Sequence, residues 1–460
     1  MKLKKIIGIS LIASLGVLAS CSNNTDTKTN ELTTTTKVNT TTKVVTTTAS
    51  TTTTTYETPS IPYEDLVIPG FKIQLENLDT NEIMLDMYQT VVPEEEACDI
   101  DLRNLDLGGW RITRIGFRCF VDSYFKNIYL PETLERIDSQ AFYNCNINGT
   151  LYLSDNLITL ENTFVGCNYI DNIYVSPDSK NFKMSNGMLY SKNKKILYYA
   201  LPNNLGDIEV SNECESILSN AFINNKCQSI TLGDNISKID SNAFVNLTNL
   251  RYINISSSNT KFKVLDNVLY DAKFENLLLA ANDPNISEFK LDSRTRAIFP
   301  NAFYNNKYIK KLTLNKNNIR VYDSAFKNSA LEEIDLSSSN LVSIGENAFE
   351  NSNIKNIDLN GVKEIGYEAF KNCLNLESIL MPSSLVFTNN YLFNQCVNLN
   401  TLIIDSKYYA EKENDLDFIK NYVEVIYVLD TITPSGIVNS NFTLQDESDR
   451  EGYNKYIRNE

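Results

Sequence analysis

The nine cysteines and the complete absence of histidine limit the chemistry that this chain can perform. Histidine is the side chain best suited to proton transfer near neutral pH and the commonest metal ligand. The cysteines show no CxxC or other spacing typical of a metal site. No P-loop, GxGxxG, GxSxG or HExxH motif is present, and no carboxylate pair stands out as desolvated. We therefore expect no enzyme, no catalytic residue, no cofactor and no metal.

Cys21 is the cysteine with the most specific surroundings. A lysine-rich start precedes an apolar run over residues 6–18, which is too short to span a membrane and suits the core of a signal peptide. The run ends in Leu18-Ala19-Ser20-Cys21, which resembles the bacterial lipobox. The resemblance implies cleavage before Cys21, a diacylglyceryl group on its sulfur and anchoring at the extracytoplasmic face of the cell membrane. The alternative is an ordinary signal peptide with an accidental cysteine, and the polar residues that follow at once disfavour it.

Threonine dominates residues 21–60, together with Lys, Asn and Ser. Such a segment has too little apolar surface to form a core. We expect it to be a disordered tether between the lipid and the folded part of the chain.

The chain is strongly acidic, with a formal net charge of −15 that becomes −18 once the three lysines of the signal peptide are removed. An acidic body repels phosphate backbones and anionic lipid headgroups. Nucleic acid is therefore not expected as a partner, and the membrane is expected to be reached only through the lipid on Cys21.

Phenylalanine recurs at nearly constant intervals through the rest of the chain. Its successive separations are 21 to 23 residues, apart from two of 58 and 59. An aliphatic residue stands five positions before most copies, and alanine often comes directly before the phenylalanine. The copies are Phe120, Phe142, Phe164, Phe222, Phe244, Phe303, Phe326, Phe349, Phe370 and Phe393.

A second pattern, of the form apolar-x-x-apolar-x-apolar, follows each phenylalanine. Its last three positions alternate with period two, which indicates a short strand with one buried face. One unit cannot bury both of its halves alone, whereas a stack of units can. Clear copies are FKNIYL at 125–130, IDNIYV at 170–175, LEEIDL at 331–336, IKNIDL at 354–359 and LNTLII at 399–404.

Together the two patterns resemble the BspA-like leucine-rich repeat, which joins a Leu-x-x-Ile-x-Leu strand to an Ile-x-x-x-Ala-Phe turn. The resemblance implies a repeat solenoid of about ten units of 22 or 23 residues with short parallel strands. It covers residues 112–404, about two-thirds of the mature chain. The proline that the family has at the end of the strand is kept only at Pro131 and Pro382.

The two long separations hold related insertions, at 175–204 and 255–285. Both contain Asn or Asp before Gly-Met-Leu-Tyr or Asn-Val-Leu-Tyr, then a polar turn and an apolar run. We expect each to be a β-hairpin folded against the solenoid.

The predicted domain organisation follows from these segments. Residues 1–20 are a lipoprotein signal peptide, 21–60 the tether and 112–404 the solenoid. An N-terminal cap over 61–111, with the single tryptophan Trp110, and a C-terminal cap or tail over 405–460 should cover the ends of the stack.

Four of the remaining cysteines stand three residues after a repeat phenylalanine, where other copies have Asn or Ser. This interchange favours buried thiols at a tight turn over a disulfide framework. Because neighbouring rungs lie about 4.8 Å apart, bridges joining Cys145 to Cys167 and Cys373 to Cys396 remain open.

Three tyrosines occupy the outward position of adjacent predicted strands: Tyr129, Tyr152 and Tyr174. They predict an aromatic patch with hydroxyl rims, suited to sugars or a peptide backbone. The alternative is that tyrosine simply favours exposed strand positions. A stripe of charge in later repeats, around Lys310, Lys311, Glu332 and Glu333, is explained by pairing between strands.

These features favour a surface-anchored, adhesin-like protein whose partner is an extracellular protein or glycan. BspA-like proteins are associated with adhesion to matrix and to other cells, as the resemblance implies. The alternative is a structural or assembly protein of the cell envelope that binds components of its own cell.

Overall fold

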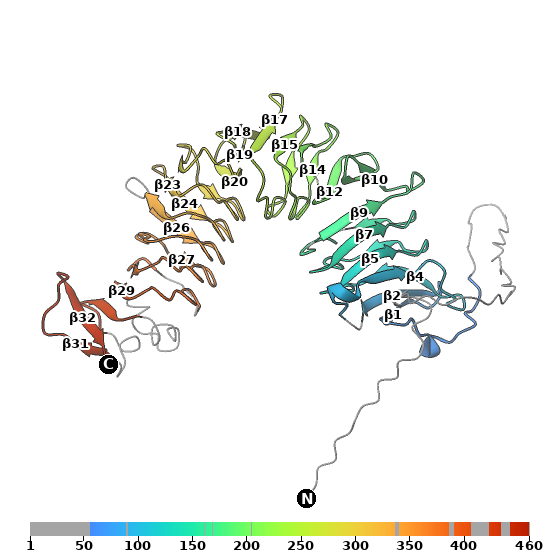
Figure 1. Cartoon of the computed structure of the whole chain (residues 1–460), viewed down its shortest axis with the longest axis horizontal. Coiled ribbons are helices and arrows are strands. Elements are labelled where there is room, and N and C mark those ends of the chain that lie inside the picture. The colour runs from blue at the N-terminus through green and yellow to red at the C-terminus, as the bar shows by residue number, and fades with distance from the viewer. Residues whose placement is uncertain are drawn as a thin grey trace, which may run out of the picture. The chain divides into compact units, whose positions relative to one another are not determined.

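The computed structural model describes residues 56–88, 91–160, 162–167, 169–203, 205–335, 340–385, 391–405, 423–433 and 442–459 (Figure 1). The predicted signal peptide, Cys21 and the tether up to residue 55 lie outside the described residues. The rest forms two compact units, one ending at Lys183 and one beginning at Met184.

Most repeats supply two strands, and both pair in parallel with their counterparts in the next repeat. The front strands carry the Leu-x-x-Ile-x-Leu pattern, and the shorter back strands carry the aliphatic residue five positions before phenylalanine. Parallel pairing follows because the chain completes a full turn before it returns to the same ladder. The predicted leucine-rich repeat solenoid with short parallel strands is confirmed.

In the first unit, the front ladder runs β3-β5-β7-β9 and the back ladder runs β4-β6-β8. An antiparallel hairpin, β1-β2, precedes them, and β2 pairs in parallel with β4. A short 3-10 helix, η1 (Tyr63–Asp65), precedes β1, and a second, η2 (Glu94–Glu96), lies between β2 and β3. The strands are β1 (Phe71–Asn77), β2 (Glu82–Tyr88), β3 (Cys98–Asp101), β4 (Arg111–Ile115), β5 (Tyr124–Tyr129), β6 (Arg136–Ile137), β7 (Asn146–Tyr152), β8 (Thr159–Leu160) and β9 (Tyr169–Tyr174).

In the second unit the front strands form two ladders, β13-β15-β17 and β21-β23-β25. Their bounds are β13 (Asp207–Glu209), β15 (Ser229–Leu232), β17 (Tyr252–Ile255), β21 (Glu288–Lys290), β23 (Lys311–Thr313) and β25 (Glu333–Asp335). The back strands are β14 (Ser216–Ile217), β16 (Lys238–Ile239), β22 (Ala297–Ile298), β24 (Asn318–Val321), β26 (Asn340–Ile344) and β27 (Glu364–Ile365).

Both insertions form antiparallel hairpins, as predicted, and the last strand of each joins a back ladder. In the second insertion β18 pairs with β19 and β19 with β20, and β20 then pairs in parallel with β22. The first insertion repeats this arrangement with β11, β12 and β14. The bounds are β10 (Phe182–Ser185), β11 (Met188–Ser191), β12 (Ile196–Ala200), β18 (Phe262–Leu265), β19 (Val268–Asp271) and β20 (Asn276–Ala280).

Near the C-terminus the parallel register continues through β28 (Ser378–Met381) and β29 (Thr401–Ile404) to β30 (Val425–Leu429). Two antiparallel strands, β32 (Tyr453–Arg458) and β31 (Phe442–Leu444), then complete the sheet. An antiparallel pair at this end stops the parallel ladder from presenting another front strand to solvent.

The repeat phenylalanines stack on one another inside the solenoid. In the second unit, the rings of Phe326, Phe349 and Phe370 lie 5.2 and 5.3 Å apart and are parallel to within 5°. The alanine before each ring is buried, and its carbonyl accepts a hydrogen bond from the phenylalanine of the preceding turn, as between Phe326 and Ala348 at 2.7 Å. The Ala-Phe pair is therefore required by both the core and the main-chain ladder.

A left-handed corner follows each phenylalanine. The residue two positions after it has a positive φ, which Asn tolerates better than most residues. These corner residues include Asn144, Asn224, Asn246, Asn305, Asn328, Asn351 and Asn372.

In several repeats the next residue donates a hydrogen bond into the preceding turn. Cys373 Sγ lies 3.0 Å from the carbonyl of Phe349, and Asn306 Nδ2 lies 3.0 Å from that of Ala281. Cysteine and asparagine therefore interchange there because both are compact donors, as well as because the turn is tight.

One predicted strand is wrong. Residues 354–359 make only an isolated bridge between Glu333 and Asn356, although Ile354 and Leu359 are buried as expected. The repeat from Phe349 to Phe370 has 21 residues, the shortest spacing in the chain. In a shorter repeat, less chain remains to form the strand's hydrogen bonds once Ile354 and Leu359 are buried.

Candidate functional site

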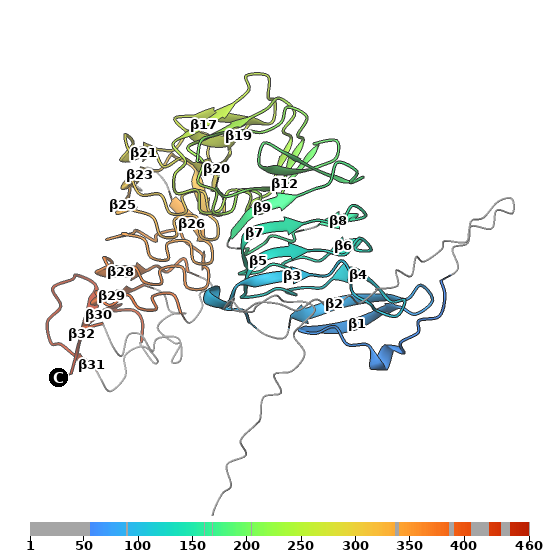
Figure 2. The same cartoon turned by 45° about the vertical axis from the view of Figure 1, so that its right-hand side comes forward.

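The front ladder of the first unit brings the three predicted tyrosines together. Its register pairs Asp101 with Tyr129, Tyr129 with Tyr152, and Tyr152 with Tyr174. Figure 2 shows β5, β7 and β9 lying one beside the next in this ladder. In-register parallel pairing sets equivalent side chains directly above one another on the same face. We call Tyr129, Tyr152 and Tyr174 the tyrosine ladder.

The rings of the tyrosine ladder are in contact. Tyr129 and Tyr152 stack with centroids 4.4 Å apart and planes 15° from parallel. Tyr152 and Tyr174 lie 5.5 Å apart with a tilt of 46°. Stacked rings cover one another's faces, so the inner tyrosines present edges and hydroxyls outward. Tyr174, at the end of the ladder, is 47% exposed.

An arginine closes the other end of the tyrosine ladder. The guanidinium carbon of Arg103 lies 4.0 Å from the ring centroid of Tyr129. Asp101 holds that guanidinium through both carboxylate oxygens, at 2.9 Å to Nε and 2.6 Å to Nη2. The bidentate grip fixes the arginine in the orientation that stacks on the ring.

A polar file runs beside the tyrosine ladder, two residues earlier on each strand. Asn127 donates to Asp99 at 3.0 Å, and its own side-chain oxygen accepts from the backbone N–H of Thr150 at 2.9 Å. Asn172 donates to the Thr150 hydroxyl at 3.3 Å. Side chains two residues apart on a strand share a face, so aromatic and hydrogen-bonding groups are presented together.

The hydroxyl of Tyr129 stays protonated at neutral pH. Burial, followed by the neighbouring Tyr152 hydroxyl, raises the pKa of Tyr129 from its ordinary value of 10.0. Hydrogen bonding to Arg103 lowers the pKa of Asp101, so this carboxylate stays charged. This end of the tyrosine ladder therefore offers the neutral hydroxyl of Tyr129 beside the ion pair of Arg103 and Asp101.

Sequence reasoning found the tyrosines and missed the groups that order them. Asp99, Asp101 and Arg103 lie within the segment predicted to be a cap. The alternation of Cys98, Ile100 and Leu102, all buried, is the signal that marks this segment as a front strand.

The charged stripe of the second unit is satisfied by pairing between strands, as predicted. Lys310 lies 3.2 Å and Lys355 2.6 Å from the carboxylate of Glu332, and Lys311 lies 2.8 Å from Glu333. Each charge has an opposite partner on the neighbouring rung, so the stripe needs no ligand to balance it.

The eight cysteines of the described residues are buried free thiols. Burial raises the pKa of Cys167 to about 12 and that of Cys214 to about 11. Because the thiolate is the reactive form, thiols with such a pKa are poor nucleophiles and poor metal ligands.

Neither a metal centre nor a membrane-spanning helix occurs in the part of the chain that the structure describes. No group of three or more Cys, Asp or Glu there is arranged to hold an ion. No helix in the same ranges has the length and hydropathy needed to cross a bilayer.

The comparisons with known proteins agree with this architecture. A family model described as BspA type leucine-rich repeat region matches residues 97–203, 180–283 and 279–400, in six copies. The chain belongs to this family. A search of curated protein sequences gives no significant match.

Several solved structures of bacterial leucine-rich repeat proteins are similar to this BspA-type chain. The pneumococcal vaccine antigen PcpA is 18% identical, with 78% of this chain and 92% of that one covered and a TM-score of 0.43. A leucine-rich cell surface protein from Faecalibacterium prausnitzii is 18% identical, with coverages of 74% and 94% and a TM-score of 0.40. A leucine-rich repeat protein from Eubacterium ventriosum is 16% identical, with coverages of 70% and 74% and a TM-score of 0.38.

Proposed function

We propose that this chain is a surface-anchored lipoprotein that binds an extracellular protein or glycan through Tyr129, Tyr152 and Tyr174. The observation that carries the proposal is the order of the tyrosine ladder. Its rings are held by stacking and by Arg103, so little side-chain freedom is lost when a partner binds. Pre-ordered tyrosines with a polar tip are typical anchors of binding surfaces.

Family membership supports a binding role. A leucine-rich repeat solenoid is a scaffold for interaction, with an extended regular face and no enclosed catalytic cleft. The resemblance noted in the sequence associates BspA-like proteins with adhesion. An envelope-assembly role uses the same scaffold and differs only in where the partner comes from.

Anchoring at Cys21 completes the proposal. The lipobox-like sequence precedes a threonine-rich tether, which would hold the solenoid away from the bilayer. A Cys21→Ser variant should leave the membrane fraction and appear in soluble fractions, because the acyl chains have no attachment point. Membrane retention of this variant would contradict the lipid anchor without touching the binding claim.

The binding claim is tested with the intact chain displayed on cells, against panels of matrix proteins and glycans. Replacing Tyr129, Tyr152 and Tyr174 together with Ala should reduce binding at least tenfold. The matched control is the Tyr367→Ala, Tyr391→Ala double variant, which removes two exposed tyrosines from the second unit. Equal binding by the triple variant and the unaltered chain would refute the ladder as a contact face.

Crosslinking on intact cells distinguishes an extracellular partner from a component of the cell's own envelope. Crosslinks to added matrix proteins or host glycoproteins that depend on the tyrosine ladder support adhesion. Crosslinks only to envelope components of the same cell would replace adhesion with the assembly role.

A further inference from the structure

A small pocket opens on the back ladder of the first unit, on a different sheet from the tyrosine ladder. Its volume is about 250 Å³. Three successive turns of the solenoid contribute to it. Its lining includes Phe117, Arg136, Asp138, Ser139, Thr159 and Asn162.

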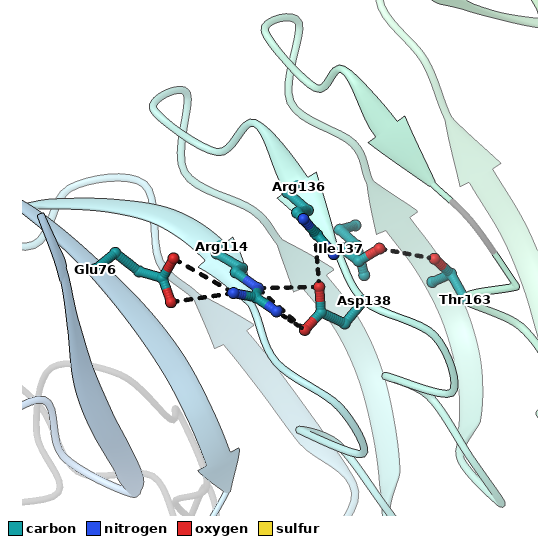
Figure 3. A network of polar contacts seen from close by, with 6 residues as sticks. All are labelled: Glu76, Arg114, Arg136, Ile137, Asp138 and Thr163. Atoms are coloured by element: carbon teal, nitrogen blue, oxygen red, sulfur yellow. Dashed lines mark hydrogen bonds and ion pairs between the residues drawn. The ribbon is translucent and has the colours of Figure 1, made fainter.

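Two lining residues, Arg136 and Asp138, belong to a polar network that also includes Arg114 and Glu76 (Figure 3). Arg114 donates to both oxygens of Asp138, with its shortest contact at 2.7 Å, and its other arm reaches Glu76 at 3.2 Å. Asp138 in turn accepts from Nε of Arg136 at 2.9 Å. The guanidinium of Arg136 is therefore oriented by a carboxylate that is itself clamped.

Arg136 keeps unused donors on the solvent side. Its side chain is 56% exposed, and within the described residues only its Nε carries a hydrogen bond or ion pair. The guanidinium has five N–H groups, so four remain for a ligand or water. Ser139, Thr159 and Asn162 add hydroxyl and amide groups around the same space.

Phe117 supplies an apolar wall. It stands three residues before a core phenylalanine and is 54% exposed, whereas Phe120 is fully buried. The guanidinium carbon of Arg118 lies 5.2 Å from its ring centroid and 4.3 Å from that of Tyr143. Covering an exposed phenyl ring at the edge of a polar pocket with another apolar surface is favourable, because it removes apolar area from water.

The arginines of this network are neutralised by carboxylates. Arg114 and Arg136 are matched by Glu76 and Asp138. Arg118, which has no ion pair within the described residues and donates to Gln140, does not line the pocket. What remains is a set of planar donors and acceptors beside an aromatic ring. A sugar ring has that complementarity, with hydroxyls at its rim and a face of C–H groups.

We propose that this pocket is a subsite for one neutral sugar ring of a glycan, with Phe117 stacking on the ring and Arg136 and Asn162 bonding its hydroxyls. The subsite stands apart from the tyrosine ladder, which lies on the front sheet. Either proposal can therefore fail without the other.

The second unit contains a similar charged pair without an aromatic residue beside it, which serves as an internal control for the pocket. Lys238 and Asp240 flank Ile239 as Arg136 and Asp138 flank Ile137, and they pair at 3.0 Å. Ser219 stands at the repeat position of Phe117, and its backbone N–H donates to Asp240 at 3.1 Å. The same charged pair thus occurs there with no aromatic wall, and no sugar subsite is expected.

The test uses the intact purified chain and fluorescent neutral oligosaccharides of glucose, galactose, mannose and N-acetylglucosamine. At least one should bind, and Phe117→Ala and Arg136→Met should each weaken it tenfold or more. Phe117→Tyr and Lys238→Met should bind as the unaltered chain does. Unchanged thermal unfolding midpoints will show that the weakened variants are folded.

Three results would overturn the proposal. The first is that none of these oligosaccharides binds. The second is that Phe117→Ala and Arg136→Met bind as tightly as the unaltered chain. The third is that uronic acid oligosaccharides or acidic peptides compete more strongly than the neutral sugars, because binding would then depend on negative charge.

Discussion

The outward face of the front strands is built differently in the two units. In the first unit it carries stacked tyrosines, with ring centroids 4.4 and 5.5 Å apart. In the second it carries lysines and glutamates paired from rung to rung, such as Lys355 and Glu332 at 2.6 Å. Both sets stand on the same parallel scaffold, so the difference lies in the side chains alone.

The stacked tyrosines and the paired charges respond differently to salt and pH. Stacked rings are held by dispersion and by burial of apolar surface, which salt and moderate pH change little. Exposed ion pairs are screened by salt and contribute little to stability. Of these two surfaces, the tyrosine ladder is therefore the one whose shape depends less on ionic conditions.

The largest expected effect is a loss of stability that should appear in both units when a stacked phenylalanine is removed. Phe142→Ala in the first unit and Phe349→Ala in the second each remove a fully buried ring from the phenylalanine stack. We expect each to cost about 3–5 kcal/mol of unfolding free energy. Urea unfolding, with hydrogen exchange to locate the affected unit, checks this. A cost below half of that range in one unit only would show that the cores differ as well as the surfaces.

One substitution in the tyrosine ladder and one in the charged stripe should differ in their cost to stability. Tyr152→Ala removes ring contacts on both sides of Tyr152 and should cost about 1–3 kcal/mol. Glu332→Ala removes two exposed ion pairs and should cost clearly less. The same urea titrations measure both. A larger loss from Glu332→Ala would reverse the comparison.

Acid should weaken the charged stripe. Hydrogen bonds from Lys355 and Lys310 lower the pKa of Glu332 from 4.5, so the unfolded chain takes up this proton first as the pH falls. The stabilisation is therefore present above pH 4.5 and is lost as the pH falls through the lower pKa of the folded state. The stability difference between the unaltered chain and Glu332→Gln should shrink over this interval.

Alkali should act on the tyrosine ladder. The pKa of Tyr129 is raised above 10.0, so the unfolded chain loses this proton first and the contribution falls as the pH rises past 10.0. Tyr129→Phe should remove this part of the alkaline loss, as measured by unfolding at stepped pH. An identical alkaline profile for Tyr129→Phe would contradict the assignment.

The smallest effect concerns the arginine that ends the tyrosine ladder. Asp101→Asn leaves the shape of the side chain and removes the charge that holds Arg103 over Tyr129. We expect about 0.5 kcal/mol of lost stability and a modest loss of binding. If binding falls as far as in the triple tyrosine variant, Arg103 rather than the rings is the main contact.

Repetition in the sequence was enough to predict the solenoid. The spacing of Phe326, Phe349 and the other copies, with an aliphatic five residues earlier, requires successive turns that bury the same positions. Parallel pairing then follows, because a chain that turns fully each period can only return in the same direction. The hairpins were also predictable, since their Leu-Tyr segments repeat and interrupt the period.

The candidate sites were predictable only in part. Tyr129, Tyr152 and Tyr174 share a repeat position, so the period alone brings them into line. Arg103 has no such relation to Tyr129, and its place over the ring depends on the grip of Asp101.

What the sequence by itself determined is the period, and with it the identity of the buried positions and the neighbours one turn apart. Only the tertiary structure decided which outward side chains touch. Phe117, Arg136 and Asn162 come from three different turns and line one pocket, where Asp138 sets the direction of Arg136. Periodicity places main chains in register, whereas the reach of a side chain depends on its rotamer and on the groups that hold it.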